Sequence, residues 1–242
     1  MNSSVPLHLR LLLPALALGL GVALDFIQPV GLLAATLFIA IVLLGDHRRP
    51  QWFWWLLGLV TSIALAAHLV PGFLPTTLAL PQRFSLDADP VAIRLSWDKL
   101  LVGLTLLAWW LGQRPQHSLS LRKAWHVMIA TLIVVPTLAL ALGLVAWQPK
   151  WPDGLWLWLL INLGVAVLAE ELLFRAWLQP CLVKRLGAWP GVLLTAALFG
   201  AAHIPFSPLF ALVPLLQVWA TDWPSTTAAA CTWPLSCMAP SI

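Results

Sequence analysis

The chain has very little charge and contains no tyrosine. Charged residues make up 9% of its 242 residues and hydrophobic residues 61%, whereas about a quarter of an ordinary soluble domain is charged. The three cysteines, Cys181, Cys231 and Cys237, have no spacing that indicates a disulfide framework or a zinc finger. No His-Glu-x-x-His run occurs, so the sequence does not support a zincin-type zinc site. This composition predicts an integral membrane protein.

The basic residues are spread over short loops between apolar runs, so the net charge of +4 gives no reason to expect a nucleic-acid partner. The expected surroundings are the lipid bilayer. Sixteen tryptophans support this, because many of them lie at the ends of apolar runs, where tryptophan anchors a helix at the membrane interface. Examples are Trp52, Trp54, Trp55, Trp109, Trp110 and Trp151.

Apolar runs of spanning or near-spanning length predict an all-α fold, a polytopic integral membrane helical bundle of about eight transmembrane helices. The first run has no clear cleavage site after it and is interpreted as an uncleaved span. No internal repeat is visible, which indicates one membrane domain. The runs cover about 9–24, 30–46, 52–70, 98–112, 125–147, 155–178, 189–204 and 208–220.

The loop charges predict the topology, because lysine and arginine accumulate on the cytoplasmic side. Basic pairs follow the second, fourth and sixth runs, whereas the other loops have no such cluster. A cytoplasmic N-terminus satisfies every loop, and a bacterial cytoplasmic (inner) membrane is the expected location. The long segment 71–97 is then extracytoplasmic. The basic pairs are Arg48 with Arg49, Arg122 with Lys123, and Lys184 with Arg185.

Two adjacent carboxylates, Glu170 and Glu171, and the guanidinium of Arg175 lie inside the sixth apolar run. Each charge costs on the order of 3 kcal/mol at the centre of a membrane helix, so a function is the default interpretation. Glu171 and Arg175 are four residues apart in the order that favours a helical ion pair, which predicts a structural role. Glu170 is turned about 100° from Glu171 and is left for chemistry. This topology places the three residues in the cytoplasmic half of the span.

Two further polar side chains are candidates for the same site. His203 ends the seventh run, just before Pro205. It is either a half-hydrated histidine at the end of a span or, together with Glu170, part of a pair of general base and electrophilic stabiliser. Asn162 lies eight residues before Glu170 and is interpreted as a helix-packing hydrogen-bonding group.

The pattern Glu170-Glu171-x-x-x-Arg175, followed by Phe199-x-x-x-His203, resembles the first two motifs of the CPBP (Abi) family of intramembrane proteases, which includes the type II CAAX prenyl endopeptidases. The resemblance implies peptide hydrolysis within the membrane, at a site open to the cytoplasm, on a membrane-associated peptide or protein. It makes Glu170 the base that activates water, Glu171 and Arg175 its support, and His203 a group that binds the oxyanion, with Phe199 in a supporting position.

The resemblance leaves the cofactor open. A glutamate-activated water needs no cofactor, whereas a metal-dependent mechanism would use a divalent metal such as zinc, with Glu170 and His203 as ligands. A second function class also stays open. In it the chain is a non-catalytic membrane scaffold or bacteriocin-immunity-type protein, and Glu171 and Arg175 form a purely structural ion pair.

The C-terminus departs from the family, which has a later His-x-x-x-Asn motif. The sequence after Ala220 loses its helical pattern, which indicates a disordered or divergent tail. A frameshift explains this divergent tail better. If codons permitted for Leu235–Ile242 are read from the third base of the leucine codon, they encode Val-Leu-His-Gly-Thr-Ile-Asn, which contains the missing His-x-x-x-Asn motif. We therefore divide the chain into N-terminal helices (1–124), a truncated protease core (125–220) and an aberrant tail (221–242), and expect weak activity or none.

Overall fold

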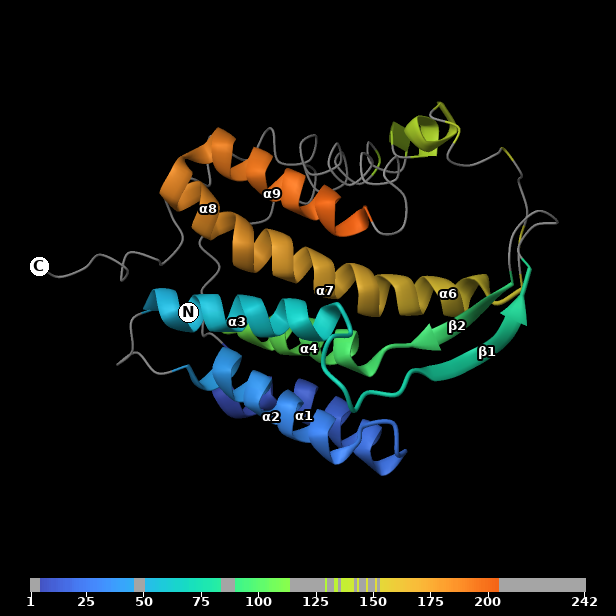
Figure 1. Ribbon diagram of the computed structural model, residues 1–242, viewed down its shortest axis with the longest axis horizontal. Coiled ribbons are helices and arrows are strands. Elements are labelled where there is room, and N and C mark those ends of the chain that lie inside the picture. Colours follow the sequence, from blue (N-terminus) through green and yellow to red (C-terminus); the bar gives the residue numbers. More distant parts are fainter. Residues whose placement is uncertain are drawn as a thin grey trace, which may run out of the picture. The chain divides into compact units, whose positions relative to one another are not determined.

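The computed structural model describes residues 5–45, 51–83, 90–113 and 153–204, together with isolated positions between 129 and 151 (Figure 1). The predicted spans at 125–147, for the most part, and at 208–220 lie outside the described residues, as does the tail at 221–242. The chain divides into two compact units. The first comprises Met1–Arg114 and Trp151–Leu173, and the second Pro115–Lys150 and Phe174–Ile242.

The described part of the chain is mostly helical, as the composition predicts. The first unit contains α1 (Leu7–Ala23), α2 (Pro29–Leu44), α3 (Gln51–Ala66), β1 (Thr76–Gln82), β2 (Val91–Leu95), α4 (Trp97–Leu111), α6 (Leu155–Ile161), the π-helical segment η1 (Asn162–Val167) and α7 (Leu168–Glu171). A second π-helical segment, η2 (Leu172–Leu178), continues into the second unit, which contains α8 (Gln179–Leu186) and α9 (Ala188–His203).

Helix α4 is the centre of the first unit, where it contacts α1, α2, α3, η1 and α7 (Figure 1). Leu101, Val102 and Leu106 are fully buried on it. Helix α7 packs beside Gly103, where an added Cβ would meet the backbone nitrogen of Ala169 at 3.4 Å, an ordinary van der Waals distance. Such small residues at helix contacts are typical of membrane bundles. The apolar core of this unit therefore holds α7 against α4.

Segment 71–97 contains a two-stranded antiparallel sheet, which corrects the all-α prediction. Strand β1 pairs with β2 from Thr76 opposite Leu95 to Gln82 opposite Val91, with irregularities in the register between these pairs. The β-branched residues of these strands favour extended backbone, a local signal that the sequence analysis did not use. The indole N–H of Trp97, the first residue of α4, donates to Thr76 Oγ1 at 2.8 Å. The sheet is thereby tied to the start of α4.

The sixth predicted span is longer than expected, since one continuous helix runs over Leu155–Leu186. At 1.5 Å per residue its 32 residues extend about 48 Å, more than the roughly 30 Å of bilayer hydrocarbon. The prediction of a loop at 180–188 is therefore wrong for all but its last residues. Pro180 does not end this helix, because it comes just after the wide turns of η2, and such local π-helical adjustments accommodate a proline in a membrane helix.

The turn between α8 and α9 is confined to Gly187, which has φ +91° and ψ 168°. This backbone region is essentially restricted to glycine. Directly after it, α9 packs tightly on α8, because a Cβ on Gly191 would lie 2.5 Å from the backbone nitrogen of Val183. Two glycines thus set the geometry of the α8–α9 hairpin.

The number of membrane spans is not confirmed. Among the described residues, Leu155–Leu186 is long and apolar enough to cross a membrane, whereas Leu7–Ala23, Pro29–Leu44, Trp52–Ala66 and Ala188–His203 are apolar but shorter. With α4, these helices coincide with six of the eight predicted runs. The helical positions are thus confirmed for these six runs, and the total of about eight spans stays a prediction.

Candidate active site

The two glutamates lie on α7, a single turn of α-helix between two π-helical segments. Segment η1 ends at Val167 and η2 begins at Leu172, so Glu170 and Glu171 are flanked on both sides by wide turns. π-Helical turns are rare and occur frequently at functional sites. This backbone is the first structural feature that sets the glutamates apart from the rest of the helix.

Glu170 forms an ion pair that the sequence analysis missed. Its Oε1 lies 3.6 Å from the Nζ of Lys99 on α4, and the two side chains are 28% and 21% exposed. The sequence analysis had left Glu170 without an assigned partner, and the structure corrects this. Lys99 could have been suspected, because a charged side chain within the apolar run 98–112 calls for an opposite charge.

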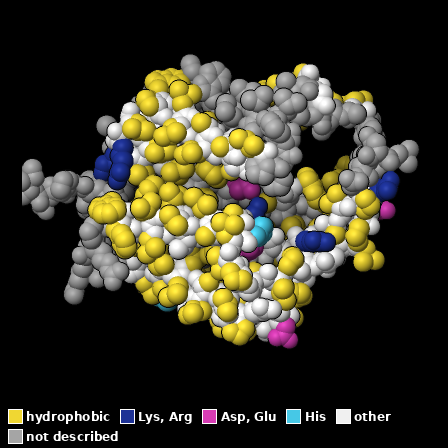
Figure 2. All heavy atoms as spheres, in the orientation of Figure 1, with side chains coloured by type: hydrophobic (Ala, Val, Ile, Leu, Met, Phe, Trp, Pro, Cys, Tyr) yellow, Lys and Arg dark blue, Asp and Glu magenta, His cyan; other side chains and the backbone are white. Residues whose placement is uncertain are grey.

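A second polar contact lies next to the first one in the sequence. Asp98 Oδ2 is 2.6 Å from Nδ1 of His68, two residues beyond the end of α3, and the Asp98 side chain is only 5% exposed. Asp98 Oδ1 also accepts the backbone N–H of Lys99 at 2.8 Å. We call His68, Asp98, Lys99 and Glu170 the ionic cluster. Figure 2 shows acidic, basic and histidine side chains close together on a largely hydrophobic face.

The ionic cluster affects the prediction of which half of the membrane contains Glu170. The sequence analysis placed Glu170 in the cytoplasmic half of its span and residues 71–97 outside the membrane. The ion pair with Lys99 and the contact of Gly103 with Ala169 instead place Glu170 beside the first two turns of α4. That end of α4 directly follows residues 71–97. Which side of the membrane it faces stays a prediction, but the glutamate and this segment belong to the same end of α4.

Glu171 is the last residue of α7, and Arg175 lies within η2. Their predicted ion pair rests on the four-residue spacing of an α-helix, whereas a π-helical turn bonds residues five apart. The ion pair therefore stays a prediction. Asn162 begins η1, and its side chain makes no hydrogen bond to another residue in the described ranges, so a packing hydrogen bond is not seen there.

His203 is the last residue of α9 and is held by Phe199. Its Nδ1 lies 2.9 Å from the carbonyl oxygen of Phe199, which can only accept, so Nδ1 is the donor. The imidazole and the Phe199 ring are 5.0 Å apart at 86°, and Phe199 also packs on Phe174 with ring centroids 4.8 Å apart. The supporting position expected for Phe199 thus has a geometric basis. In the neutral ring, Nε2 is an acceptor, and it donates only when both nitrogens carry protons.

Glu170 belongs to the first unit and His203 to the second, and their approach to one another stays a prediction. A metal centre also stays untested. Within the described ranges, no three His, Cys, Asp or Glu side chains are grouped so that they could hold a metal ion. The predicted tail motif lies outside these ranges.

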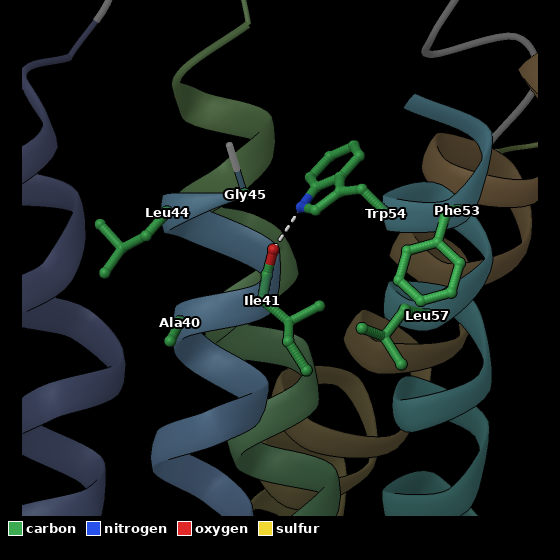
Figure 3. A pocket seen from close by; sticks show the side chains of 7 residues that line it. All are labelled: Ala40, Ile41, Leu44, Gly45, Phe53, Trp54 and Leu57. Carbon is green, nitrogen blue, oxygen red and sulfur yellow. Dashed lines mark hydrogen bonds between the residues drawn. The ribbon is translucent and has the colours of Figure 1, made fainter. Parts of the chain in front are cut away.

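An apolar pocket of about 320 Å³ lies between α2 and α3, away from the glutamates (Figure 3). The indole N–H of Trp54 donates to the carbonyl oxygen of Ile41 at its edge. That carbonyl is in the last turn of α2, where backbone acceptors lack helical partners. No titratable side chain lines this pocket, so it serves the packing of the two helices rather than chemistry. Its lining consists of Ala40, Ile41, Leu44, Gly45, Phe53, Trp54 and Leu57.

The described part of the chain is mostly helical, with one helix long and apolar enough to cross a membrane and with ionisable side chains that contact one another between helices. Residues 152–235 match the family model of the type II CAAX prenyl endopeptidases, Rce1-like. The resemblance to the CPBP group is thereby confirmed. The matched segment includes Glu170, Glu171, Arg175 and His203, whereas three members of the ionic cluster precede it. No curated protein and no solved structure matches the chain.

The limits of the match differ from the predicted domain limits. The matched segment begins at residue 152 instead of 125 and extends to residue 235, beyond the predicted end of the core at residue 220. The division of the chain into three parts stays a prediction. The match does place the glutamate pair within the Rce1-like segment.

Proposed function

We propose that this chain is an intramembrane endopeptidase in which Glu170 activates a water molecule for attack on a peptide carbonyl. The observation that carries the proposal is the position of Glu170. It lies in the Rce1-like segment, between two π-helical turns, and is half-buried beside the ammonium of Lys99. A charged carboxylate inside a membrane helix bundle is energetically costly, so it is interpreted as a functional group by default.

The reaction follows from the residues in named roles. Glu170 takes a proton from water while the water oxygen bonds to the carbonyl carbon, and it then gives that proton to the departing amine. Glu171 and Arg175 support Glu170. His203 donates from Nε2 to the oxyanion when its ring carries both protons, because Nδ1 is already bonded to the Phe199 carbonyl. The substrate is a membrane-associated peptide or protein, and no cofactor takes part.

A metal-dependent mechanism is the alternative for the same site. The neutral tautomer of His203, with Nδ1–H on a backbone carbonyl, presents Nε2 in the manner of a metal-bound histidine. In that case Glu170 and His203 would hold a divalent metal such as zinc, which would supply an activated water. A chelator added to the assay separates the two mechanisms, since a glutamate-only site keeps its activity.

The test uses the purified chain in liposomes with prenylated C-terminal peptides, followed by mass spectrometry under single-turnover conditions. We expect slow cleavage that Glu170→Gln abolishes, while Asp153→Asn, the matched loss of a carboxylate that precedes Glu170 by 17 residues, retains it. Folding and membrane insertion of both variants are checked by gel filtration and protease protection. Cleavage that survives in a folded Glu170→Gln variant rules out the general-base role.

A non-catalytic scaffold or bacteriocin-immunity-type protein is the second candidate function. It is favoured by one observation, the missing His-x-x-x-Asn motif after residue 203. This candidate predicts that neither the chain nor a variant with the alternative reading frame restored cleaves any peptide, although both insert in the membrane.

A further inference from the structure

We infer that Lys99 is a positioning residue for Glu170 and that the Asp98–His68 pair holds the helix end that carries it. The inference rests on the proposed function and adds to it a residue from outside the Rce1-like segment, which begins at residue 152. The observation behind it is the ionic cluster, in which the Asp98–His68 contact and the Lys99–Glu170 ion pair meet at consecutive residues of α4.

The backbone of Lys99 is held on both sides by packing. Trp97 is 3% exposed and Leu101 is fully buried in the same apolar cluster, so the first turn of α4 is part of the core. One turn further along, Gly103 faces the backbone of Ala169, the residue before Glu170, which an added Cβ would contact at 3.4 Å. Helices α4 and α7 are therefore at a fixed separation where the Lys99 side chain crosses between them.

Asp98 has a structural task in the cluster that explains its burial. A buried carboxylate is costly unless charged or hydrogen-bonding groups surround it. Here the His68 imidazole and the Lys99 backbone N–H both contact it, at 2.6 Å and 2.8 Å. His68 has φ +58°, an uncommon conformation for a residue other than glycine, which is stable only when the surroundings hold it. The end of α3 is thus fastened to the first turn of α4.

With its backbone fixed in this way, Lys99 can restrict the carboxylate of Glu170. A glutamate on a helix has several side-chain rotamers, and a charge partner 3.6 Å away selects those that keep the contact. Correct placement of a catalytic group accounts for a large part of enzymatic rates, and small displacements are costly. Lys99 would accordingly affect the rate of cleavage more than the binding of the peptide.

The first test examines the geometry in the chain itself and needs no activity. A water-soluble carbodiimide adds to the Glu170 carboxyl, the Lys99 amine attacks the activated carbonyl carbon, and a urea leaves, so an amide bond forms with net loss of one water from the protein. Peptide mapping is expected to find the Lys99–Glu170 cross-link in the unmodified chain and in the control Lys184→Arg, but not in Lys99→Arg. Absence of the cross-link from the folded unmodified chain overturns the inference.

The second test examines the role. Under single-turnover conditions, Lys99→Met is expected to slow cleavage at least 10-fold while the half-saturating peptide concentration changes less than 2-fold, and Lys99→Arg is expected to recover most of the rate. A merely structural lysine would leave the single-turnover rate of the folded Lys99→Met variant unchanged.

The outcomes separate this inference from the proposed function. If the unmodified chain cleaves and Lys99→Met, still folded, cleaves equally fast, then Lys99 has no positioning role and the proposed function stands. If the cross-link forms but no form of the chain cleaves any peptide, the proposed function fails, and the role of Lys99 in catalysis fails with it.

Discussion

Replacing Gly191 by alanine is expected to force α9 away from α8. The added Cβ would lie 2.5 Å from both the nitrogen and the Cα of Val183 and 2.8 Å from its Cγ2. Carbon atoms in contact prefer about 3.5 to 4.0 Å, so the two helices must separate by roughly 1 Å. Overpacking of this kind costs about 1–3 kcal/mol, and the better helix propensity of alanine returns at most ~1 kcal/mol. Relative to an alanine substitution without the clash, the expected loss is therefore about 1–3 kcal/mol of unfolding free energy.

The assay is equilibrium unfolding in detergent, with Gly164→Ala as the matched control. A Cβ at Gly164 meets nothing within 4 Å, so the same substitution there should be neutral or slightly stabilising. The Gly191 variant should also lose cleavage activity, because α9 carries His203. If Gly191→Ala is as stable as Gly164→Ala, the close approach of α8 and α9 is not as the structure has it.

Three further predictions concern the turn, the topology and the tail. Gly187→Ala should cost about 1–3 kcal/mol in the same unfolding assay, because φ +91° with ψ 168° is strained for any side chain, and equal stability would contradict the turn geometry. Cysteines placed in segment 71–97 should react with an impermeant external reagent whereas a cysteine at position 184 should not, and external labelling at 184 would reverse the topology. Restoring the alternative frame near codon 219 should add a span with a histidine and an asparagine. The cleavage rate should then rise by a factor on the order of 100, because one oxyanion donor contributes about that much. An unchanged cleavage rate in the membrane-inserted protein would rule out the frameshift explanation.

Apolar periodicity was enough to locate the helices, since the helices seen in six of the eight predicted runs lie where the sequence places them. The glutamate pair could also be found in this way, because charge inside an apolar run is visible without a fold. Pro180 and Gly187 show the limit of local signals. Both are helix breakers by type, yet only Gly187 breaks the helix, since the wide turns of η2 just before Pro180 accommodate the proline.

The ionic cluster could not be assembled from the sequence for a different reason. Lys99 and Glu170 are far apart in the chain, and their contact depends on the close packing of α4 on α7 at Gly103. The π-helical segments likewise depend on tertiary context and have no sequence pattern that separates them from α-helix. Long-range ion pairs and wide turns therefore had to come from the structure, whereas the identity of the glutamates did not.

The two-stranded sheet has a consequence for the supply of water to the reaction. A sheet of two strands has open edges, whose backbone groups need water and cannot lie in hydrocarbon. Strand β2 contacts α6, and the side-chain amide of Gln82 donates to the carbonyl of Asp153 just before this helix, so the sheet lies along α6 (Figure 1). From Leu155, where α6 begins beside the sheet, to Glu170 is about 22 Å along the helix. A hydrolase inside a membrane consumes one water per bond, and here the hydrated sheet brings that reactant to within a few helical turns of the carboxylate that would activate it.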